Sequence, residues 1–370
     1  MVIGIIKEIK AEENRVSMTP AGGEVMIQNK HIVLVEKGAG EGSGFTDEAY
    51  SVAGAEIVDN AENVYNRAEM IMHVKEPMPS EYKYIRENHI IFTYFHLAAN
   101  EDLTHALIDS RSINIAYETI QKPNGSLPLL TPMSEVAGKM AIQQGAKYLE
   151  MAQGGHGVLL GGVPGVDPGT VLIIGGGIAG INAAKMACGI GAKVYLLDIS
   201  LERLRYLSDV MPPNCFLLMS KPSTIRRLIG EAEVVVGAVL IPGTKAPKLV
   251  TRDMLSSMKK GAVMVDIAID QGGCFETSRP TTHSAPTYMV DGIVHYCVAN
   301  MPGAVPRTST LALTNATLPY AVEIANKGWK KAFAENNEIK CGANVVKGEV
   351  TYKGVAEAFN LEYIPAERLL

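Results

Sequence analysis

The chain has 370 residues, of which 47% are hydrophobic and 20% are charged, as in an ordinary globular protein. Its formal net charge is −5, and no stretch dense in lysine and arginine offers a surface to phosphates, so we exclude a nucleic-acid partner. A chain of this length has room for two domains, each with its own core.

The opening residues and the cysteines bear on the cellular compartment. The first ten residues, MVIGIIKEIK, alternate Val or Ile with polar residues, which predicts a strand and not a signal peptide. The five cysteines are widely spaced and form no CxxC pair, which favours a reducing compartment. The apolar stretch after residue 170 is interrupted by Asn182, Lys185 and several glycines, well short of the roughly 18 residues that a membrane span needs. We therefore expect a cytoplasmic protein that has no membrane partner.

The first third of the chain repeats a strand and then a helix. Short apolar runs bounded by polar residues predict the strands, and helical patterns lie between them. This alternation predicts a parallel sheet covered by helices, in which ligands bind beyond the carboxyl ends of the strands. The predicted strands are 2–6, 32–36, 70–74, 90–95 and 113–117, the predicted helices are 21–29, 47–53 and 101–109, and the polar residues beyond strand ends are Lys7, Glu8, Lys75, Glu76, His96 and Glu118.

The segment TVLIIGGGIAGINAAKMACGIGAKVYLLD carries a dinucleotide-binding pattern. It predicts a strand, a turn with Gly175, Gly177 and Gly180, a helix, and a second strand that ends at Asp198. Glycines allow the tight turn, the approach of the backbone to a pyrophosphate and the close packing of the helix, whose first N–H groups favour an anion. Asp198 lies 18 positions after Gly180, near the spacing of about 20 that a ribose contact requires, and its charge repels a 2′-phosphate. The pattern predicts NAD rather than NADP, with a purely structural turn as the alternative.

A domain boundary is predicted near Leu130. Further segments support two domains: a helix at 134–151, buried strands at 233–239, 263–268 and 293–298, and a helical pattern at 309–336 that returns the chain to the first domain. We therefore expect an α/β fold of two doubly wound, Rossmann-like domains with parallel sheets. The nucleotide domain, residues 131–306, is expected to be inserted into a discontinuous substrate domain, residues 1–130 and 307–370.

Seven motifs are spread along the chain, and several of them are specific rather than compositional. They are KEIKAEENRVSMTP at 7–20, HVKEPMP at 73–79, FTYFHLA at 92–98, LLTPMSEVAGKMA at 129–141, VLIIGGGIAG at 171–180, VDIAIDQGG at 265–273 and VANMPGAVPRTST at 298–310. Together they resemble the bacterial alanine dehydrogenase family, which also includes the nucleotide-binding subunit of proton-pumping transhydrogenases. The resemblance implies an NAD-dependent enzyme that interconverts L-alanine with pyruvate and ammonium, assembled as a homohexamer.

The chemistry of such a reaction fits three residues in these motifs. Oxidation at the α-carbon passes a hydride to the nicotinamide and leaves an iminium, which adds water and releases ammonia. The site needs a cation for the carboxylate, a donor to the carbonyl oxygen and a group that exchanges protons near neutral pH. Arg15 can clamp the carboxylate with two hydrogen bonds, Lys75 can donate to its second oxygen or to the carbonyl, and His96 can exchange protons. The resemblance implies these roles, whereas each residue alone is more typical of a surface charge, a local ion pair or a structural histidine.

The resemblance also implies the other contacts of the site. Asp270, after the strand predicted at 263–268, is expected to face the nicotinamide and to join His96 in catalysis across an interdomain cleft. Tyr94 and Met133 are expected to shape a small pocket around the alanine methyl group. No histidine pair has a metal-ligand spacing, so no metal is expected. Besides the three glycines and Asp270, NAD contacts are implied for Ser134, Ile178, Ala179, Asp198, Arg203, Ser220, Val239, Leu240, Ile267, Ala268, Arg279, Val298, Asn300 and Met301.

Two other functions stay open. A transhydrogenase subunit would pass hydride between two nucleotides, and it would not need Lys75 and His96 arranged for an amino acid. A catalytically inactive NAD-binding or sensing protein is the other alternative. It would not explain why Arg15, Lys75, His96 and Asp270 are all present. The glycine-rich loop at 154–157, GGHG, lacks the basic residue expected after its glycine pair, so no contact is assigned to it.

Overall fold

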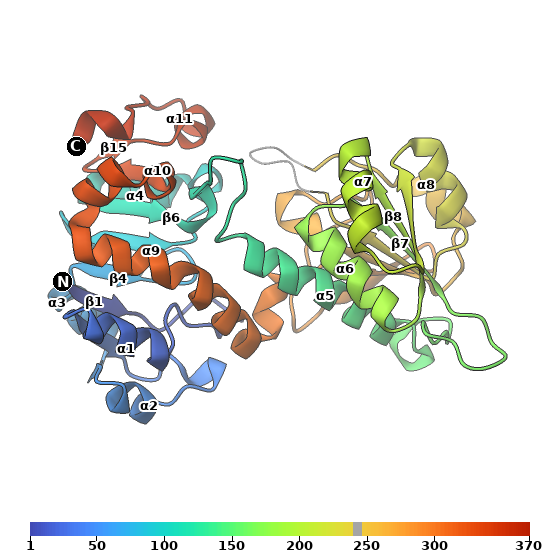
Figure 1. The fold of residues 1–370 in the computed structure, drawn as a ribbon, viewed down its shortest axis with the longest axis horizontal. Helices are drawn as coiled ribbons and strands as arrows, with labels where there is room; N and C mark the ends of the chain where they lie inside the picture. The colour runs from blue at the N-terminus through green and yellow to red at the C-terminus, as the bar shows by residue number, and fades with distance from the viewer. Residues whose placement is uncertain (240–245) are drawn as a thin grey trace. The chain divides into compact units, whose positions relative to one another are not determined.

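The computed structural model describes residues 1–239 and 246–370 and divides the chain into two compact units. Unit 1 contains Met1–Met133 and Val305–Leu370, and unit 2 contains Ser134–Ala304. Unit 1 is therefore built from both ends of the chain, the blue-to-cyan and red parts of Figure 1. The first boundary falls in the first turn of helix α5 (Thr131–Tyr148). Leu240, one of the residues expected to bind NAD, lies outside the described residues.

Unit 1 contains an eight-stranded sheet with the order β15-β14-β6-β5-β4-β1-β2-β3. Strands β1 to β6 are parallel, whereas β14 pairs antiparallel with β6 and β15 with β14. Successive strands lie on one side of β1 up to β3 and on its other side from β4 onward, so the topological switch point lies between β1 and β4. The strands are β1 (Val2–Ile5), β2 (Ile32–Glu36), β3 (Glu56–Val58), β4 (Met70–Met72), β5 (Ile90–Thr93), β6 (Ile113–Ala116), β14 (Ala343–Val346) and β15 (Glu349–Val350).

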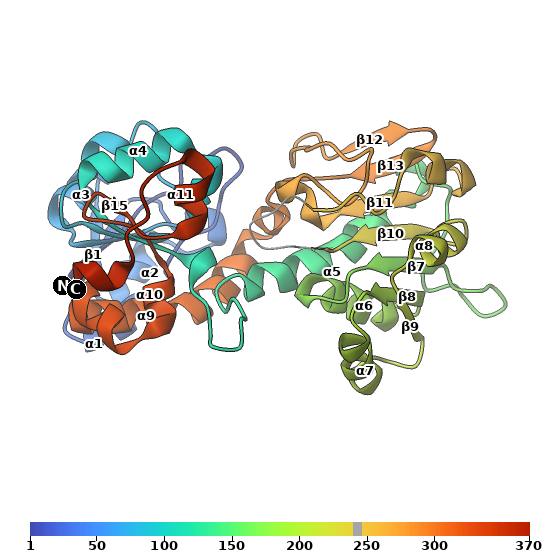
Figure 2. The same ribbon diagram turned by 90° about the horizontal axis from the view of Figure 1, so that it is seen from above.

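Helices cover both faces of the unit 1 sheet (Figure 2). Helices α3, α4 and α11 supply Val64, Leu107 and Val355 to a core that includes Ile71 and Ile91 of the sheet. On the opposite face, α1 and α9 lie side by side (Figure 1). The helices are α1 (Pro20–Gln28), α2 (Asp47–Val52), α3 (Ala61–Arg67), α4 (Glu101–Ser110), α9 (Pro306–Glu335, with a break at Gly328), α10 (Asn337–Cys341) and α11 (Lys353–Phe359).

Unit 2 contains a seven-stranded sheet with the order β12-β13-β11-β10-β7-β8-β9 (Figure 2). Every pair is parallel except β12 with β13. The switch point lies between β7 and β10, which are in register from the Val171–Val234 pair to the Ile174–Gly237 pair. The strands are β7 (Thr170–Ile174), β8 (Lys193–Asp198), β9 (Cys215–Met219), β10 (Val234–Gly237), β11 (Val263–Asp266), β12 (Thr287–Val290) and β13 (Ile293–Tyr296).

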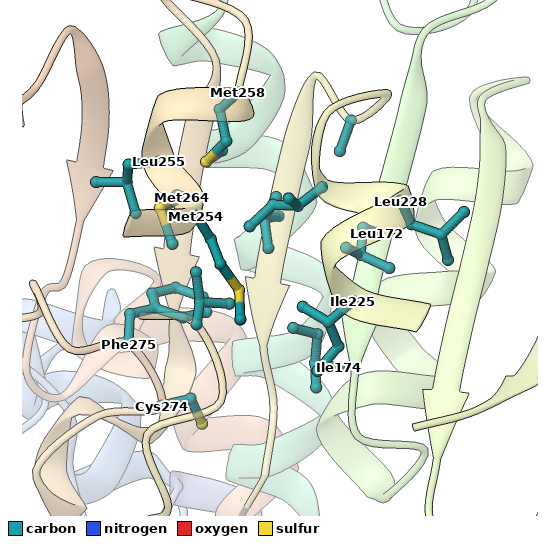
Figure 3. Packing of buried hydrophobic residues seen from close by; sticks show 14 of the residues in the cluster. Leu172, Ile174, Ile225, Leu228, Met254, Leu255, Met258, Met264, Cys274 and Phe275 are labelled. Atoms are coloured by element: carbon teal, nitrogen blue, oxygen red, sulfur yellow. The ribbon is translucent and has the colours of Figure 1, made fainter. Parts of the chain in front are cut away.

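The core of unit 2 fixes its strands against the helices. Leu228 of α8 belongs to one apolar cluster with Leu172 of β7 and Phe275, which follows β11 (Figure 3). Helix α5 approaches α6 so closely that a Cβ at Gly138 would lie 2.2 Å from the carbonyl oxygen of Ala179. The helices besides α5 are α6 (Ile178–Gly189), α7 (Leu201–Val210) and α8 (Pro222–Ile229).

The observed architecture confirms the expected α/β class but adds three antiparallel strands to the expected parallel sheets. Both sheets are mostly parallel, but β12, β14 and β15 are antiparallel strands that the sequence does not predict. β12 and β15 lie at sheet edges, and β14 lies between β15 and β6. β15 has only two residues, β12 is not fully buried at any position and β14 has only four residues, so each lacks a long apolar run. Among the described residues, no helix is both long and apolar enough to cross a membrane.

Candidate active site

In unit 1, polar residues gather at the carboxyl edge of the sheet, on both sides of the switch point. Beyond the ends of β1, β4, β5 and β6 lie, in that order, Glu8, Lys75, His96 and Glu118. The Glu8 carboxylate accepts a hydrogen bond from the backbone N–H of Val74 at 2.6 Å and so joins the segment after β1 to the segment after β4. The topology therefore places these strand ends where a ligand of a doubly wound sheet binds.

The backbone around Lys75 is held by neighbouring strands. The Thr93 hydroxyl donates to the Lys75 carbonyl oxygen at 2.8 Å. The backbone N–H of Tyr94 donates to the Val74 carbonyl oxygen at 3.4 Å. Together with the bond from Val74 to Glu8, these contacts fix the main chain from which the half-buried Lys75 side chain starts.

Arg15 is buried in an ion pair with Glu13. Arg15 Nε donates to Glu13 Oε1 at 2.7 Å and Nη2 donates to Oε2 at 2.5 Å, and the two side chains are 2% and 1% exposed. Burial opposes the charged guanidinium, but the hydrogen bond and charge of Glu13 outweigh burial and raise the pKa of Arg15. Nη1 donates to Met133 Sδ at 3.1 Å, so Arg15 and Met133 are neighbours, as a shared substrate pocket requires. The sequence did not indicate a role for Glu13, although it lies in the same motif.

Tyr94 connects the expected methyl pocket to His96. Its buried hydroxyl donates to the Leu129 carbonyl oxygen at 2.5 Å, and burial raises the pKa of Tyr94. The Tyr94 and His96 rings are stacked, with centroids 6.1 Å apart and planes inclined by 8°. The Tyr117 ring meets Tyr94 edge to face at 5.0 Å. Tyr94 is therefore a fixed wall beside His96.

His96 is exposed and its backbone is constrained. Its side chain is 51% exposed, and its φ of 53° lies in the left-handed region that non-glycine residues rarely adopt. The Glu118 carboxylate accepts the His96 backbone N–H at 2.6 Å and the Phe95 backbone N–H at 3.1 Å. Glu118 Oε1 also lies 4.0 Å from His96 Nδ1. A strained backbone at a strand end, held by a neighbouring carboxylate, is common at functional sites.

In unit 2, the glycine turn has the geometry of a dinucleotide cradle. Gly175 has a φ of 108°, which favours glycine, and a Cβ at Gly180 would lie 1.7 Å from the Gly175 carbonyl oxygen. A Cβ at Gly177, the N-cap of α6, would meet no described atom within 4 Å. The first turn of α6 thus faces open space and presents N–H groups to an anion.

Asp198 and Arg203 hold this turn from its far side. Asp198 Oδ2 accepts the backbone N–H of Gly176 at 2.8 Å, and Oδ1 accepts that of Ser200 at 2.8 Å. Arg203 Nε donates to the Gly176 carbonyl oxygen at 2.7 Å. The backbone N–H of Ser220, after β9, donates to the Asp198 carbonyl oxygen at 2.9 Å. Asp198, which is expected to contact the ribose, and Arg203, which is expected to contact NAD, therefore also shape the glycine turn, a role that the motif did not indicate.

Asp270 lies in the short 3₁₀ helix η7 (Ile267–Gln271), which follows β11. Its Oδ2 accepts the backbone N–H of Asn300 at 3.4 Å. The fully buried Asp266 fixes this region: its carboxylate accepts the N–H groups of Ala268 at 3.1 Å and Cys274 at 2.8 Å. Burial outweighs these hydrogen bonds and raises the pKa of Asp266. The sequence did not single out Asp266, although it lies in the motif that contains Asp270.

The other residues expected to bind NAD are spread along the carboxyl edge of this sheet. The Arg279 guanidinium lies 4.1 Å from the centre of the Tyr288 ring. The side chains of Val298 and Met301 are buried, so a ligand would meet them chiefly through their backbone. Ser134 lies in α5, Ile178 and Ala179 begin α6, Val239 follows β10, and Ile267 and Ala268 lie in η7.

The GGHG loop belongs to the other edge of the unit 2 sheet. His156 Nε2 is hydrogen-bonded to Glu233, and Lys259 Nζ donates to the same carboxylate at 2.5 Å. Glu233 precedes β10 and Lys259 precedes β11, so this cluster lies at the amino ends of the strands. His156 therefore anchors the loop away from the glycine turn. Across residues 1–239 and 246–370, no cluster of three or more His, Cys, Asp or Glu side chains is arranged to hold a metal ion.

Two α/β units with Rossmann strand order, one with a dinucleotide cradle and the other with a polar strand edge, define a class of two-domain, nucleotide-binding enzymes. Residues 4–137 match the family model "Alanine dehydrogenase/PNT, N-terminal domain", and residues 141–353 match "Alanine dehydrogenase/PNT, C-terminal domain". The chain therefore belongs to the alanine dehydrogenase/PNT family.

Individual relatives agree with this assignment along the whole chain. The chain is 56% identical to an alanine dehydrogenase of Methanococcus maripaludis over 371 aligned positions, which cover 100% of both chains. A solved L-alanine dehydrogenase structure superposes with a TM-score of 0.95 at 48% identity, and the match covers 97% of this chain and 99% of the other. A transhydrogenase structure from Sinorhizobium meliloti gives a TM-score of 0.82 at 23% identity, over 95% of this chain and 99% of the other, which shows a shared fold.

Proposed function

We propose that this protein is an NAD-dependent alanine dehydrogenase that interconverts L-alanine with pyruvate and ammonium. Full-length identity of 56% to a curated alanine dehydrogenase supports the activity, and the family is pyridine nucleotide-dependent. The observation that carries the proposal is the gathering of Lys75 and His96 at one sheet edge with the buried Arg15 in the same unit. A nucleotide-to-nucleotide transhydrogenase would not need this set.

The residues of unit 2 fit a bound NAD. The open space beside Gly177 leaves room for a pyrophosphate at the first N–H groups of α6. Asp198 ends β8, where its carboxylate can accept the ribose hydroxyl groups and repel a 2′-phosphate. We propose that unit 2 holds the cofactor and that unit 1 holds the amino acid.

In unit 1, Arg15 binds the substrate carboxylate in the proposed reaction. Glu13 fixes the guanidinium plane and keeps it charged, so little rearrangement is needed when a carboxylate binds. Lys75 donates to the second carboxylate oxygen or to the carbonyl oxygen of pyruvate. Tyr94 and Met133 leave room for a methyl group and exclude longer side chains.

His96 moves the protons. It accepts one from the water that attacks the iminium carbon and returns one to the departing ammonia, tasks that suit an imidazole near neutral pH. Asp270 orients the water and stabilises the cationic stages. NAD supplies the hydride acceptor, and the chemistry therefore needs residues of both units.

We also propose a cytoplasmic homohexamer. All five cysteines are free, which is typical of a reducing compartment. Sedimentation velocity over a range of concentrations tests the assembly, because a monomer at all concentrations contradicts it.

The activity is tested by following NADH at 340 nm with purified protein. L-alanine should reduce NAD, and pyruvate with ammonium should oxidise NADH. Pyruvate without ammonium is the control, because a 2-hydroxy acid dehydrogenase would still turn over. Oxidation of NADH that does not require ammonium would overturn the proposal.

A further inference from the structure

A group of titratable side chains surrounds the buried His73 in unit 1, two residues before Lys75. His73 directly follows β4 and is 1% exposed. Its Nδ1 lies 3.4 Å from Glu8 Oε1, and its Nε2 lies 2.9 Å from the Tyr65 hydroxyl oxygen and 3.9 Å from Glu81 Oε1. The reaction proposed above uses neither His73 nor these partners.

The charges around His73 favour its protonated form. Carboxylates come from three elements: Glu8 follows β1, Glu36 ends β2 and Glu81 precedes the 3₁₀ helix η2 (Tyr82–Tyr84), while Tyr65 comes from α3. Burial opposes an imidazolium, but the hydrogen bond and charge of Glu8 and the charges of Glu81 and Glu36 outweigh it and raise the pKa of His73. Without this cation, the carboxylates would repel one another in a poorly solvated site.

Glu8 links this cluster to the substrate lysine. The oxygen that faces His73, Oε1, also accepts the backbone N–H of Val74 at 2.6 Å. Val74 precedes Lys75, and its carbonyl oxygen accepts the Tyr94 backbone N–H at 3.4 Å. A change in the position of Glu8 therefore acts on the main chain that presents Lys75.

We infer that His73 is a positioning residue: as an imidazolium it holds Glu8 against the backbone of Val74 and thereby fixes Lys75 for the substrate. This inference rests on the proposed function, because it assigns Lys75 to pyruvate and alanine. The contribution is complete below the ordinary histidine pKa of about 6.5 and is lost as pH rises through the raised pKa of His73. The KM for pyruvate should accordingly rise on the alkaline side.

His89 provides a matched control for a His73→Gln variant. It is buried, and its ring lies 6.1 Å from the same Tyr65 ring. Burial, with the nearby charge of Arg86, lowers the pKa of His89 to about 4, so it is neutral at assay pH. His73→Gln therefore removes a buried cation, whereas His89→Gln removes a buried neutral ring from the same neighbourhood.

The test has a kinetic readout and a structural one. His73→Gln should raise the KM for pyruvate on the order of tenfold with a much smaller change in kcat, and it should abolish the alkaline rise in KM. Hydrogen–deuterium exchange at the Val74 amide should become faster. His89→Gln should leave the KM for pyruvate, its alkaline rise and the Val74 exchange rate unchanged. For both variants, unchanged NADH binding by fluorescence shows that unit 2 is intact.

The outcomes separate this inference from the proposed function. Equal KM values in the two variants, or unchanged Val74 exchange in His73→Gln, would overturn the role of His73. If the unmodified protein does not turn over alanine or pyruvate, the proposed function fails, and the exchange measurement still decides whether His73 holds the Val74 backbone. If His73→Gln does not fold, Tyr65→Phe removes only the hydrogen bond to Nε2 and should shift KM and exchange in the same direction by less; no shift contradicts the inference.

Discussion

The two units share one strand order but carry different residues at the switch point. When only the parallel strands are considered, the strand order is β3-β2-β1-β4-β5-β6 in unit 1 and β9-β8-β7-β10-β11-β13 in unit 2. In unit 2, the first strand leads into a glycine turn in which Gly177 faces open space. In unit 1, the first strand leads to Glu8 and, a little further along, to the buried pair of Glu13 and Arg15. The same topology thus provides one location for a ligand, and the local residues decide whether backbone or side chains bind it.

The sharpest test of this division concerns the proton chemistry. His96→Ala and Asp270→Asn should each lower kcat by roughly a hundredfold or more, the scale of lost general acid–base catalysis. NADH binding by fluorescence should stay nearly intact, because neither variant alters the glycine turn. The double variant should lose much less than the product of the two single losses, since residues that act on one step are not additive. Fully multiplicative losses in kcat, or an active His96→Ala enzyme, would show that groups other than His96 and Asp270 transfer the protons.

Cofactor choice tests the side chain that ends β8. Asp198 should favour NAD over NADP by on the order of a hundredfold in kcat/KM, because its carboxylate repels a 2′-phosphate. Initial rates with both cofactors at saturating L-alanine measure this ratio. Comparable efficiencies in the unmodified protein would show that Asp198 serves only to hold the turn through Gly176.

Helix α6 allows a matched test of the backbone cradle. Gly177→Ala should raise the KM for NAD on the order of tenfold, because the new methyl group fills the space left for the pyrophosphate. Gly189→Ala is the control: Gly189 is the last residue of the helix that Gly177 caps, and a Cβ there would also meet no described atom within 4 Å. Both variants should keep the melting temperature of the unmodified protein and its KM for L-alanine, which depends on unit 1. Equal KM values for NAD in the two variants would place the cofactor elsewhere.

The smallest expected effect concerns substrate size. Beside Tyr94 and Met133, the extra methylene of L-2-aminobutyrate should lower kcat/KM by roughly tenfold relative to L-alanine, and larger side chains should lower it further. A Met133→Ala variant should reduce the difference in kcat/KM between L-alanine and L-2-aminobutyrate, because it removes one wall of the pocket. Oxidation of leucine or glutamate faster than alanine would contradict the assigned pocket.

Periodic apolar runs and glycine spacing were enough to predict much of the fold. The strand, glycine turn and helix at Ile178 are local features, and the α/β class and the family are confirmed. The antiparallel strands escaped prediction because pairing with distant residues, such as Ala343 of β14 with Ile115 of β6, is not a local property. The catalytic assignments remain predictions, and the supporting carboxylates of Glu13 and Asp266 were missed because their importance comes from burial and partners.

The division of unit 1 between the two ends of the chain has a consequence for synthesis. Unit 2 is continuous, so all of its strands leave the ribosome before β14 is made. Until then, β6 has no partner on the side that β14 will occupy, and an unpaired edge can join a neighbouring nascent chain. Unit 2 can therefore fold during translation, whereas the sheet of unit 1 is completed only at the end of it.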